Sequence, residues 1–325
     1  MRLKSTTIGA VFATFTGLVW GGQFVVGKSA LGTVNAFPLT TLRYALAASL
    51  WLVLLAAVEG REALRLDGRG LRLLWLGTLG FAGFNLFLYT GLAHARPQSA
   101  SLIVALGPLL TALVLWRRTR AAPTPATFLL LAVALAGVAL VISGGHPSTI
   151  VDGSIGYGDA LAFVGVFSFV LYGLGAAEFS AHGFSALRYT ALTAGLGWLA
   201  IAASTAVAQA AGLVPVPSGA DLWAITPQIA YLALPGAFIA VLTWNSAIRT
   251  IGPQNAVLFG NLIPVTTFAI ETVRGYRPGP AELGGAALTI GALVASNLLA
   301  RRGAGRTVNE RTELASYESE LEGAV

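Results

Sequence analysis

Residues 97–111 read PQSASLIVALGPLLT, and residues 253–267, 156 positions further along the chain, read PQNAVLFGNLIPVTT. The two stretches share a Pro-Gln pair at the start, a second proline at the same place and a final threonine. A further echo places LRY at 42–44 and again at 187–189. Because prolines and glutamine recur at matched positions, we interpret the chain as two diverged copies of one unit.

The composition places nearly all of this chain in lipid. Of its 325 residues 55% are apolar and only 10% are charged, and the mean hydropathy is +0.74. A helical crossing of the hydrocarbon core needs about 20 mostly apolar residues. We therefore predict an all-α integral membrane protein with ten transmembrane helices, at 7–28, 37–58, 72–92, 98–117, 125–143, 159–178, 185–208, 227–248, 254–273 and 280–300.

Each copy of the repeat holds five spans, so the second copy enters the membrane from the opposite face. The prediction is two inverted five-helix repeats, the architecture of many secondary transporters. We divide the chain into a first repeat (1–144), an extracytoplasmic linker (145–157), a second repeat (158–300) and a charged, disordered cytoplasmic tail (301–325).

The basic residues predict the orientation. Fifteen of the 20 Lys and Arg residues fall on one face, which the positive-inside rule makes cytoplasmic. We therefore expect a multi-pass protein of the bacterial plasma (inner) membrane with both termini in the cytoplasm. The net charge of +6 thus reports topology and not a nucleic-acid partner. Arg2 and Lys4 before the apolar stretch 8–20 also fit a signal peptide, but no small-residue cleavage site follows, so the stretch reads as the first span.

The sequence lacks the residues and motifs that several kinds of chemistry require. The chain has no Cys, its three His lie in or beside predicted loops, and it shows no Gly-rich phosphate loop, nucleophile elbow, paired carboxylates or zinc pattern. These absences argue against an ATP-driven pump and most membrane enzymes, and we expect no resident metal or cofactor. We expect a secondary transporter, with a membrane enzyme, a receptor or an assembly factor as the alternatives; the oligomeric state is left open.

Four segments resemble the EamA family of the drug/metabolite transporter superfamily: WGGQFVVGK (20–28), PLTTLRYALAA (38–48), ALGPLLTALV (105–114) and NLIPVTTFAIE (261–271). The resemblance covers about residues 7–300. It implies ten helices around a central cavity, with the fifth and tenth helices at the back. It also implies transport of amino acids, metabolites or toxic compounds, most often outward. These motifs are specific for the superfamily and weak for the substrate.

Arg43 is the deepest cation. It lies about four residues from the centre of its span, roughly 6 Å along the helix axis. Either it snorkels to the outer headgroups, or it recognises an anion or pairs within a gate. Its repeat mate Arg188 lies closer to the inner interface, where a structural role is favoured.

Glu271 shares a helical face with Pro264 and Thr267. It is either half of an interfacial ion pair or a residue that couples transport to an ion. An uncharged set supplies amide groups and aromatic surfaces for the polar and apolar parts of a zwitterion. Its alternative role is helix packing and interface anchoring. The set comprises Trp20, Gln23, Asn85, Tyr89, Tyr172, Trp244, Asn245 and Asn261.

Pro108 and Pro264 are expected to form a pair of hinges. Each proline removes one helical hydrogen bond and frees the carbonyl four residues earlier, at Val104 and Gly260. A free carbonyl is tolerated in lipid only beside protein or water, which places both prolines toward the bundle interior. The alternative is a pair of packed kinks without motion.

We therefore expect export of amino acids or related small metabolites by alternating access. Uptake or exchange of a nucleoside, a sugar or a phosphorylated metabolite is the alternative within transport. A phosphorylated solute is expected to need several intramembrane cations, and only Arg43 is clearly available.

Overall fold

The computed structural model describes residues 2–120, 122–146 and 156–299, and every regular element among them is helical. Ten helices are long and apolar enough to cross a membrane, and their ends differ from the predicted ones by at most three residues. The ten predicted spans are thus confirmed, whereas the tail and most of the predicted linker lie outside the described residues. The spans are Thr6–Ala30, Ala36–Val58, Gly70–His94, Pro97–Thr119, Pro125–Ser143, Tyr157–Ala181, Ala186–Ala210, Thr226–Ile251, Asn255–Val273 and Pro280–Leu299.

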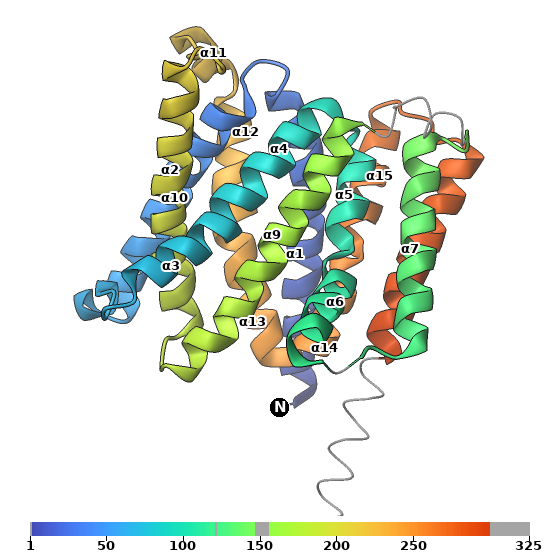
Figure 1. The fold of residues 1–325 in the computed structure, drawn as a ribbon, viewed down its shortest axis with the longest axis horizontal. Helices are drawn as coiled ribbons and strands as arrows, with labels where there is room; N and C mark the ends of the chain where they lie inside the picture. Colours follow the sequence, from blue (N-terminus) through green and yellow to red (C-terminus); the bar gives the residue numbers. More distant parts are fainter. Residues whose placement is uncertain (1, 121, 147–155, 300–325) are drawn as a thin grey trace, which may run out of the picture.

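Six spans run as single helices and four are interrupted (Figure 1). The continuous ones are α1 (Arg2–Ala30), α2 (Ala36–Val58), α7 (Pro125–Ser143), α9 (Tyr157–Ala181), α10 (Ala186–Ala210) and the tenth span (Pro280–Leu299). Span three consists of α3 (Gly70–Gly77), the π-helix η2 (Thr78–Gly83) and α4 (Phe84–His94). Span eight consists of α12 (Thr226–Tyr231), the π-helix η3 (Leu232–Ile239) and α13 (Ala240–Ile251).

The fourth and ninth spans break shortly before their second proline. Span four consists of α5 (Pro97–Ala105) and α6 (Gly107–Thr119), and span nine of α14 (Pro253–Gly260) and α15 (Leu262–Val273). At the breaks, the N–H groups of Leu106 and Asn261 bond to the carbonyls three residues earlier, at Ile103 and Leu258. A proline cannot donate the usual helical bond, so the tighter turn before it is the expected adjustment.

The interruptions fall at matching places in the two halves. Shifting η2 by the 156-residue offset of the repeat places it on residues 234–239, inside η3. The packing follows the same pattern: α1 lies against α13 and α15 of the second half, and α9 lies against α4 and α5 of the first. This arrangement is consistent with an inverted repeat.

The fifth and tenth spans form a separate pair at one flank of the bundle, where Figure 1 draws α7 in green beside a red helix. They touch through their backbones. A Cβ on Gly137 would lie 2.5 Å from the Gly285 carbonyl, and Thr289 Oγ1 donates to the Ala134 carbonyl at 3.2 Å. Small residues permit this close approach of two helices.

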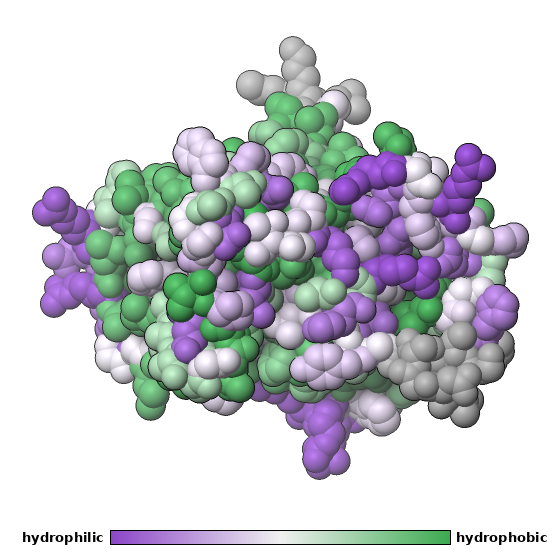
Figure 2. Space-filling model, turned by 90° about the horizontal axis from the view of Figure 1, so that it is seen from above, coloured by the Kyte–Doolittle hydropathy of each residue, from purple (hydrophilic) through white to green (hydrophobic). Residues whose placement is uncertain are grey.

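The surface suits a bilayer. Large apolar side chains such as Val53 (67% exposed), Leu129 (64%) and Val207 (69%) face outward from the spans. Figure 2, which looks at one end of the molecule, shows groups of hydrophilic residues on the end face and hydrophobic residues along part of the outline. Exposed apolar surface on this scale indicates that lipid surrounds the bundle.

Candidate functional site

Arg43 lies at the centre of a buried polar cluster, and only 5% of its surface is exposed. Its guanidinium makes four hydrogen bonds: Nε to the Leu232 carbonyl (3.0 Å), Nη1 to Asn85 Oδ1 (3.3 Å) and Tyr89 Oη (2.7 Å), and Nη2 to Gln23 Oε1. The partners come from α1, α4 and η3, so the side chain connects four spans. We call these five residues the Arg43 cluster. Arg43 is directed into the protein interior, not along the helix toward the headgroups.

Small residues make room for the cluster. A Cβ on Gly27 of α1 would lie 2.7 Å from Tyr89 Cε1, and one on Gly236 of η3 would lie 2.9 Å from Gln23 Cδ. No side chain larger than hydrogen fits at either position without moving the partner. The two glycines therefore allow Tyr89 and Gln23 to reach the guanidinium.

The π-helix η3 supplies backbone acceptors that the sequence analysis missed. The Leu232 carbonyl accepts from Arg43, and the Gly236 carbonyl accepts from Trp20 Nε1 (3.1 Å) and Gln23 Nε2 (3.4 Å). In a π-helix the bonds run to the fifth residue, which opens the backbone to other donors. Pro235, inside η3, was the available signal because proline cannot complete the helical ladder.

Of the predicted uncharged set, five members gather here and three do not. Gln23, Asn85 and Tyr89 bond to Arg43, Trp20 bonds to Gly236, and the Trp244 ring lies 5.4 Å from that of Trp20.

The other three members of the set lie elsewhere. Tyr172 stacks on Tyr189 at 5.2 Å and makes no hydrogen bond to Arg43. Asn261 donates to the Leu258 carbonyl at the break in span nine (3.0 Å), and Asn245 lies part-buried on α13.

The hinge and coupling candidates occupy different surroundings. Pro264 is buried, whereas Pro108 is exposed at the start of α6. Glu271 lies near the end of α15, and its Oε1 is 3.8 Å from the Arg274 guanidinium, so the ion-pair geometry that we weighed against coupling is present. These placements leave hinge motion and coupling as proposals.

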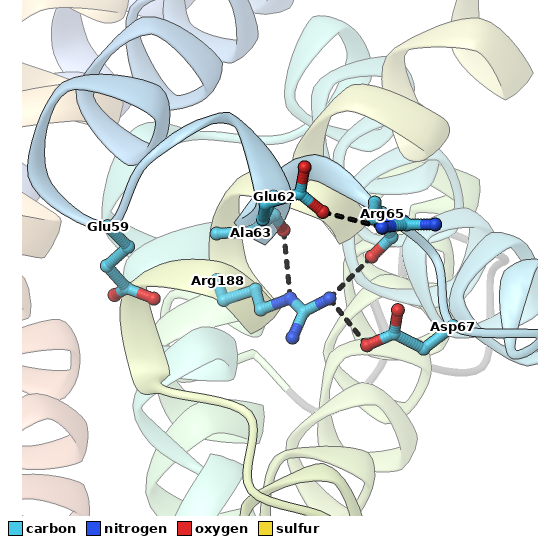
Figure 3. A pocket seen from close by; sticks show the side chains of 6 residues that line it. All are labelled: Glu59, Glu62, Ala63, Arg65, Asp67 and Arg188. Carbon is cyan, nitrogen blue, oxygen red and sulfur yellow. Dashed lines mark hydrogen bonds and ion pairs between the residues drawn. The ribbon is translucent and has the colours of Figure 1, made fainter.

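Polar contacts also join the spans at the end of the bundle where α1 begins, which we call the amino-terminal end. The loop after α2 and the start of α10 enclose an open hollow of about 420 Å³ (Figure 3). Across it Arg188 donates to the carbonyls of Ala63 (2.8 Å) and Arg65 (2.6 Å) and pairs with Asp67 at 2.7 Å. Arg188 therefore holds a loop, which agrees with the structural role favoured for it.

At the opposite end, two cations bond to the carbonyls that end helices. Lys28 donates to the carbonyls of Leu92, Ala93 and Ala95, at 2.8 to 2.9 Å. Arg96 donates to the carbonyls of Val141 and Ile142, at 3.0 and 3.1 Å. A cation favours the negative end of a helix dipole, so these contacts fasten the ends of α4 and α7.

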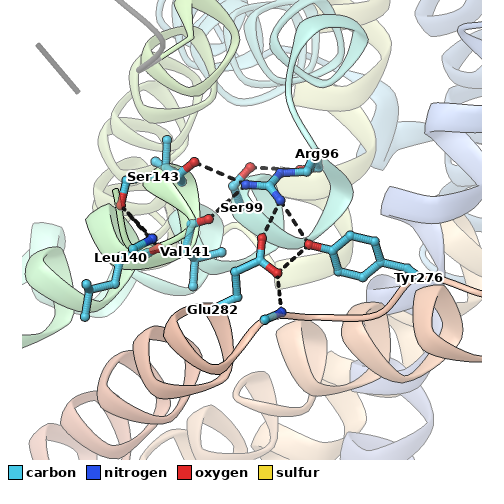
Figure 4. A network of polar contacts seen from close by, with 10 residues as sticks. Arg96, Ser99, Leu140, Val141, Ser143, Tyr276 and Glu282 are labelled. Carbon is cyan, nitrogen blue, oxygen red and sulfur yellow. Dashed lines mark hydrogen bonds and ion pairs between the residues drawn. The ribbon is translucent and has the colours of Figure 1, made fainter. Parts of the chain in front are cut away.

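Arg96 also joins the tenth span to this end. Figure 4 shows Glu282 and Tyr276 directed toward its guanidinium. Arg96 pairs with Glu282, and the Tyr276 hydroxyl donates to Glu282 Oε2 at 2.6 Å. Burial, with the Glu282 hydrogen bond, raises the pKa of Tyr276, which lies between spans nine and ten.

A ten-span bundle around a buried polar centre is the architecture of a multi-pass membrane transporter. More narrowly, the chain belongs to the EamA-like transporter family, whose family model matches residues 7–143 and again residues 156–298.

Two similar proteins are also described as transporters. The chain is 29% identical to the uncharacterized transporter YrdR of Bacillus subtilis (strain 168) over 93% of this chain and 95% of that protein. It is 30% identical to the uncharacterized transporter YyaM of the same organism, over 89% and 92%. A solved crystal structure of a protein superposes with a TM-score of 0.60 at 26% identity, covering 93% of this chain and all of that one.

Proposed function

We propose that this protein is a secondary transporter that exports amino acids or related small metabolites across the bacterial plasma membrane by alternating access. The observation that carries the proposal is the Arg43 cluster. A buried ionised residue in a membrane bundle is costly, so it is a candidate for a functional site such as a solute pathway. In this chain Arg43, on α2, bonds to residues of α1, α4 and η3, and so to both halves.

Contacts at the two ends support alternating access. At the amino-terminal end Arg188 holds the loop after α2, and Arg72 pairs with Glu178 at 2.7 Å. At the opposite end Lys28 and Arg96 fasten helix ends. A transporter of this kind opens one end while the other stays closed, so each set of contacts is suited to serve as one gate.

The interrupted spans are suited to bend between these gates. Spans three, four, eight and nine each change helical geometry near the middle. Kinks at prolines and π segments are the usual places where a helix bends. We therefore keep Pro108 and Pro264 as proposed hinges and Glu271 as a proposed coupling residue, with the amino-terminal end cytoplasmic.

The cluster favours small solutes with one anionic group over phosphorylated ones. Among the described residues, Arg43 is the only Lys or Arg that is buried. A phosphate group with about two charges is usually met by several cations or backbone N–H groups. Amino acids and related carboxylates therefore fit this site better than nucleotide-linked or phosphorylated solutes.

The deciding experiment is transport by the purified protein in proteoliposomes. Radiolabelled amino acids, nucleosides and sugars are screened with and without a proton gradient, and empty liposomes and the Arg43→Ala variant are measured in parallel. We expect wild-type protein to move at least one amino acid or related metabolite and the variant to lose that flux. Transport confined to nucleosides or sugars, or no flux above empty liposomes, would refute the proposal.

A further inference from the structure

The charge of the Arg43 cluster is unbalanced. Arginine stays protonated in proteins, and every bonding partner of this buried guanidinium is neutral. Among the described residues no carboxylate lies within ion-pair distance of Arg43, although Arg72, Arg96 and Arg188 at the bundle ends each have one. Buried charges are normally paired. The centre of the bundle therefore carries a net positive charge that lacks its counter-ion.

Two hydrogen-bond donors in the cluster have no acceptor among the described residues. The second N–H of Arg43 Nη2 has no acceptor among the described residues, because that nitrogen donates only to Gln23. The Tyr89 hydroxyl accepts from Arg43 at 2.7 Å, and its own proton likewise finds no acceptor there. A carboxylate has two oxygens that accept such paired donors.

The same place offers an apolar wall but no second charge. The rings of Trp20 and Trp244 lie side by side, and Trp20 shares the Gly236 carbonyl with Gln23. An ammonium group of a bound solute would find only carbonyl oxygens that already accept bonds. The cluster thus has a cation for a negative group but no carboxylate for a positive one.

We propose that the solute bound by Arg43 is a small monocarboxylate with an apolar body and a net negative charge, held by Arg43 and Tyr89. The proposal rests on the proposed function and narrows its substrate class from amino acids and related metabolites to organic anions. It predicts that a zwitterion binds less tightly than the anion of the same skeleton.

The missing charge is tested first without any ligand. Gln23→Glu places a carboxylate against Arg43, and Gln23→Met removes the acceptor without adding charge. Thermal unfolding of the full chain in nanodiscs is followed by intrinsic Trp fluorescence. We expect Gln23→Glu to unfold several degrees above wild type and Gln23→Met below it. Asn85→Asp is the second carboxylate variant, in case Gln23→Glu does not fold. If both carboxylate variants unfold at or below the wild-type temperature, a counter-ion is already present and the inference falls.

The solute class is tested with four probes on one skeleton: 3-phenylpropanoate, phenylalanine, 3-phenylpropanamide and phenethylamine. Binding is titrated by the fluorescence of the Trp pair. We expect the carboxylate to bind about tenfold or more tightly than the amide, which corresponds to one hydrogen bond between charged groups. Arg43→Gln should abolish that preference, and Tyr89→Phe should reduce it.

The two proposals fail differently. Equal binding of all four probes, or of none, overturns the inference, and so does phenylalanine matching the carboxylate. If proteoliposomes still export a zwitterion in those cases, the proposed function stands. If no solute is exported while Gln23→Glu stabilises the protein and the carboxylate binds best, the anion site stands and the proposed function fails.

Discussion

Replacing Glu282 by Gln tests the contacts that join the fifth and tenth spans to the rest of the bundle. The carboxylate is 8% exposed, pairs with Arg96, and accepts from the Tyr276 hydroxyl at 2.6 Å and the Gly279 N–H at 3.0 Å. Glutamine keeps the shape of glutamate but carries no charge. It has one acceptor oxygen in place of two, so its N–H₂ group must face at least one of the donors.

The magnitude follows from these three bonds. Each bond to a charged group contributes about 1.5–3 kcal/mol, against about 0.5–1.5 kcal/mol for a neutral one. Arg96 is 44% exposed, so solvent screens its share. We expect a loss of about 2 kcal/mol in the free energy of unfolding, which corresponds to a Tm lower by about 4 °C.

The assay is thermal unfolding followed by the intrinsic fluorescence of the seven Trp residues. Glu271→Gln is the matched control. It lies at the same end, and its pair with Arg274 is 3.8 Å long and more exposed, so about 0.5 kcal/mol or less is expected. Equal Tm changes in the two variants would show that the Arg96 network is no stronger than an ordinary surface pair.

Four further predictions follow. Alkaline phosphatase fused after Val325 should be inactive, and a highly active fusion would refute the ten-span topology with cytoplasmic termini. Arg43→Ala should insert normally but lose most transport; normal flux at equal expression would assign it a packing role.

Tyr276→Phe should remove a loss of stability above about pH 10, because the raised pKa keeps the folded tyrosine protonated where the unfolded one ionises; an unchanged Tm–pH curve would contradict this. Single Cys residues on this Cys-free chain should react with a small hydrophilic thiol reagent and be protected by substrate; inertness at all positions would reject the hinges. The positions are Val104, Thr111, Gly260 and Thr267.

The sequence predicted the spans well because their signal is local. About 20 apolar residues flanked by charges define a crossing whatever it packs against, so every span was placed within three residues at each end. The helical breaks in spans four and nine also had local signals in Pro108 and Pro264. The π segments had weaker ones: η3 contains Pro235, but η2 contains only the glycines of TLGFAG.

The site was predicted only in part, since it depends on how each helix is rotated about its axis. Arg43, Gln23, Asn85 and Tyr89 were identified because a polar group in lipid must find a partner. Tyr172 and Asn245 satisfied the same criterion, yet neither is among the hydrogen-bond partners of Arg43. The carbonyls of Leu232 and Gly236 carry no signal in their own side chains, because a backbone acceptor becomes available only when the helical ladder changes; Pro235 was the indirect signal.

The π-helix η2 ties the chain length of span three to the positions of Asn85 and Tyr89. The bonds of a π segment span five residues and those of an α-helix span four, so the π segment holds one extra residue. One residue turns an α-helix by about 100°. Deleting any single residue of Thr78–Gly83 would let the span close into regular α-helix. All of α4 would then be rotated relative to α3 by roughly a quarter turn, carrying both side chains off the guanidinium while leaving the hydropathy of the span intact. A homologue one residue shorter here would give the same hydropathy plot and yet lack these two hydrogen bonds to Arg43.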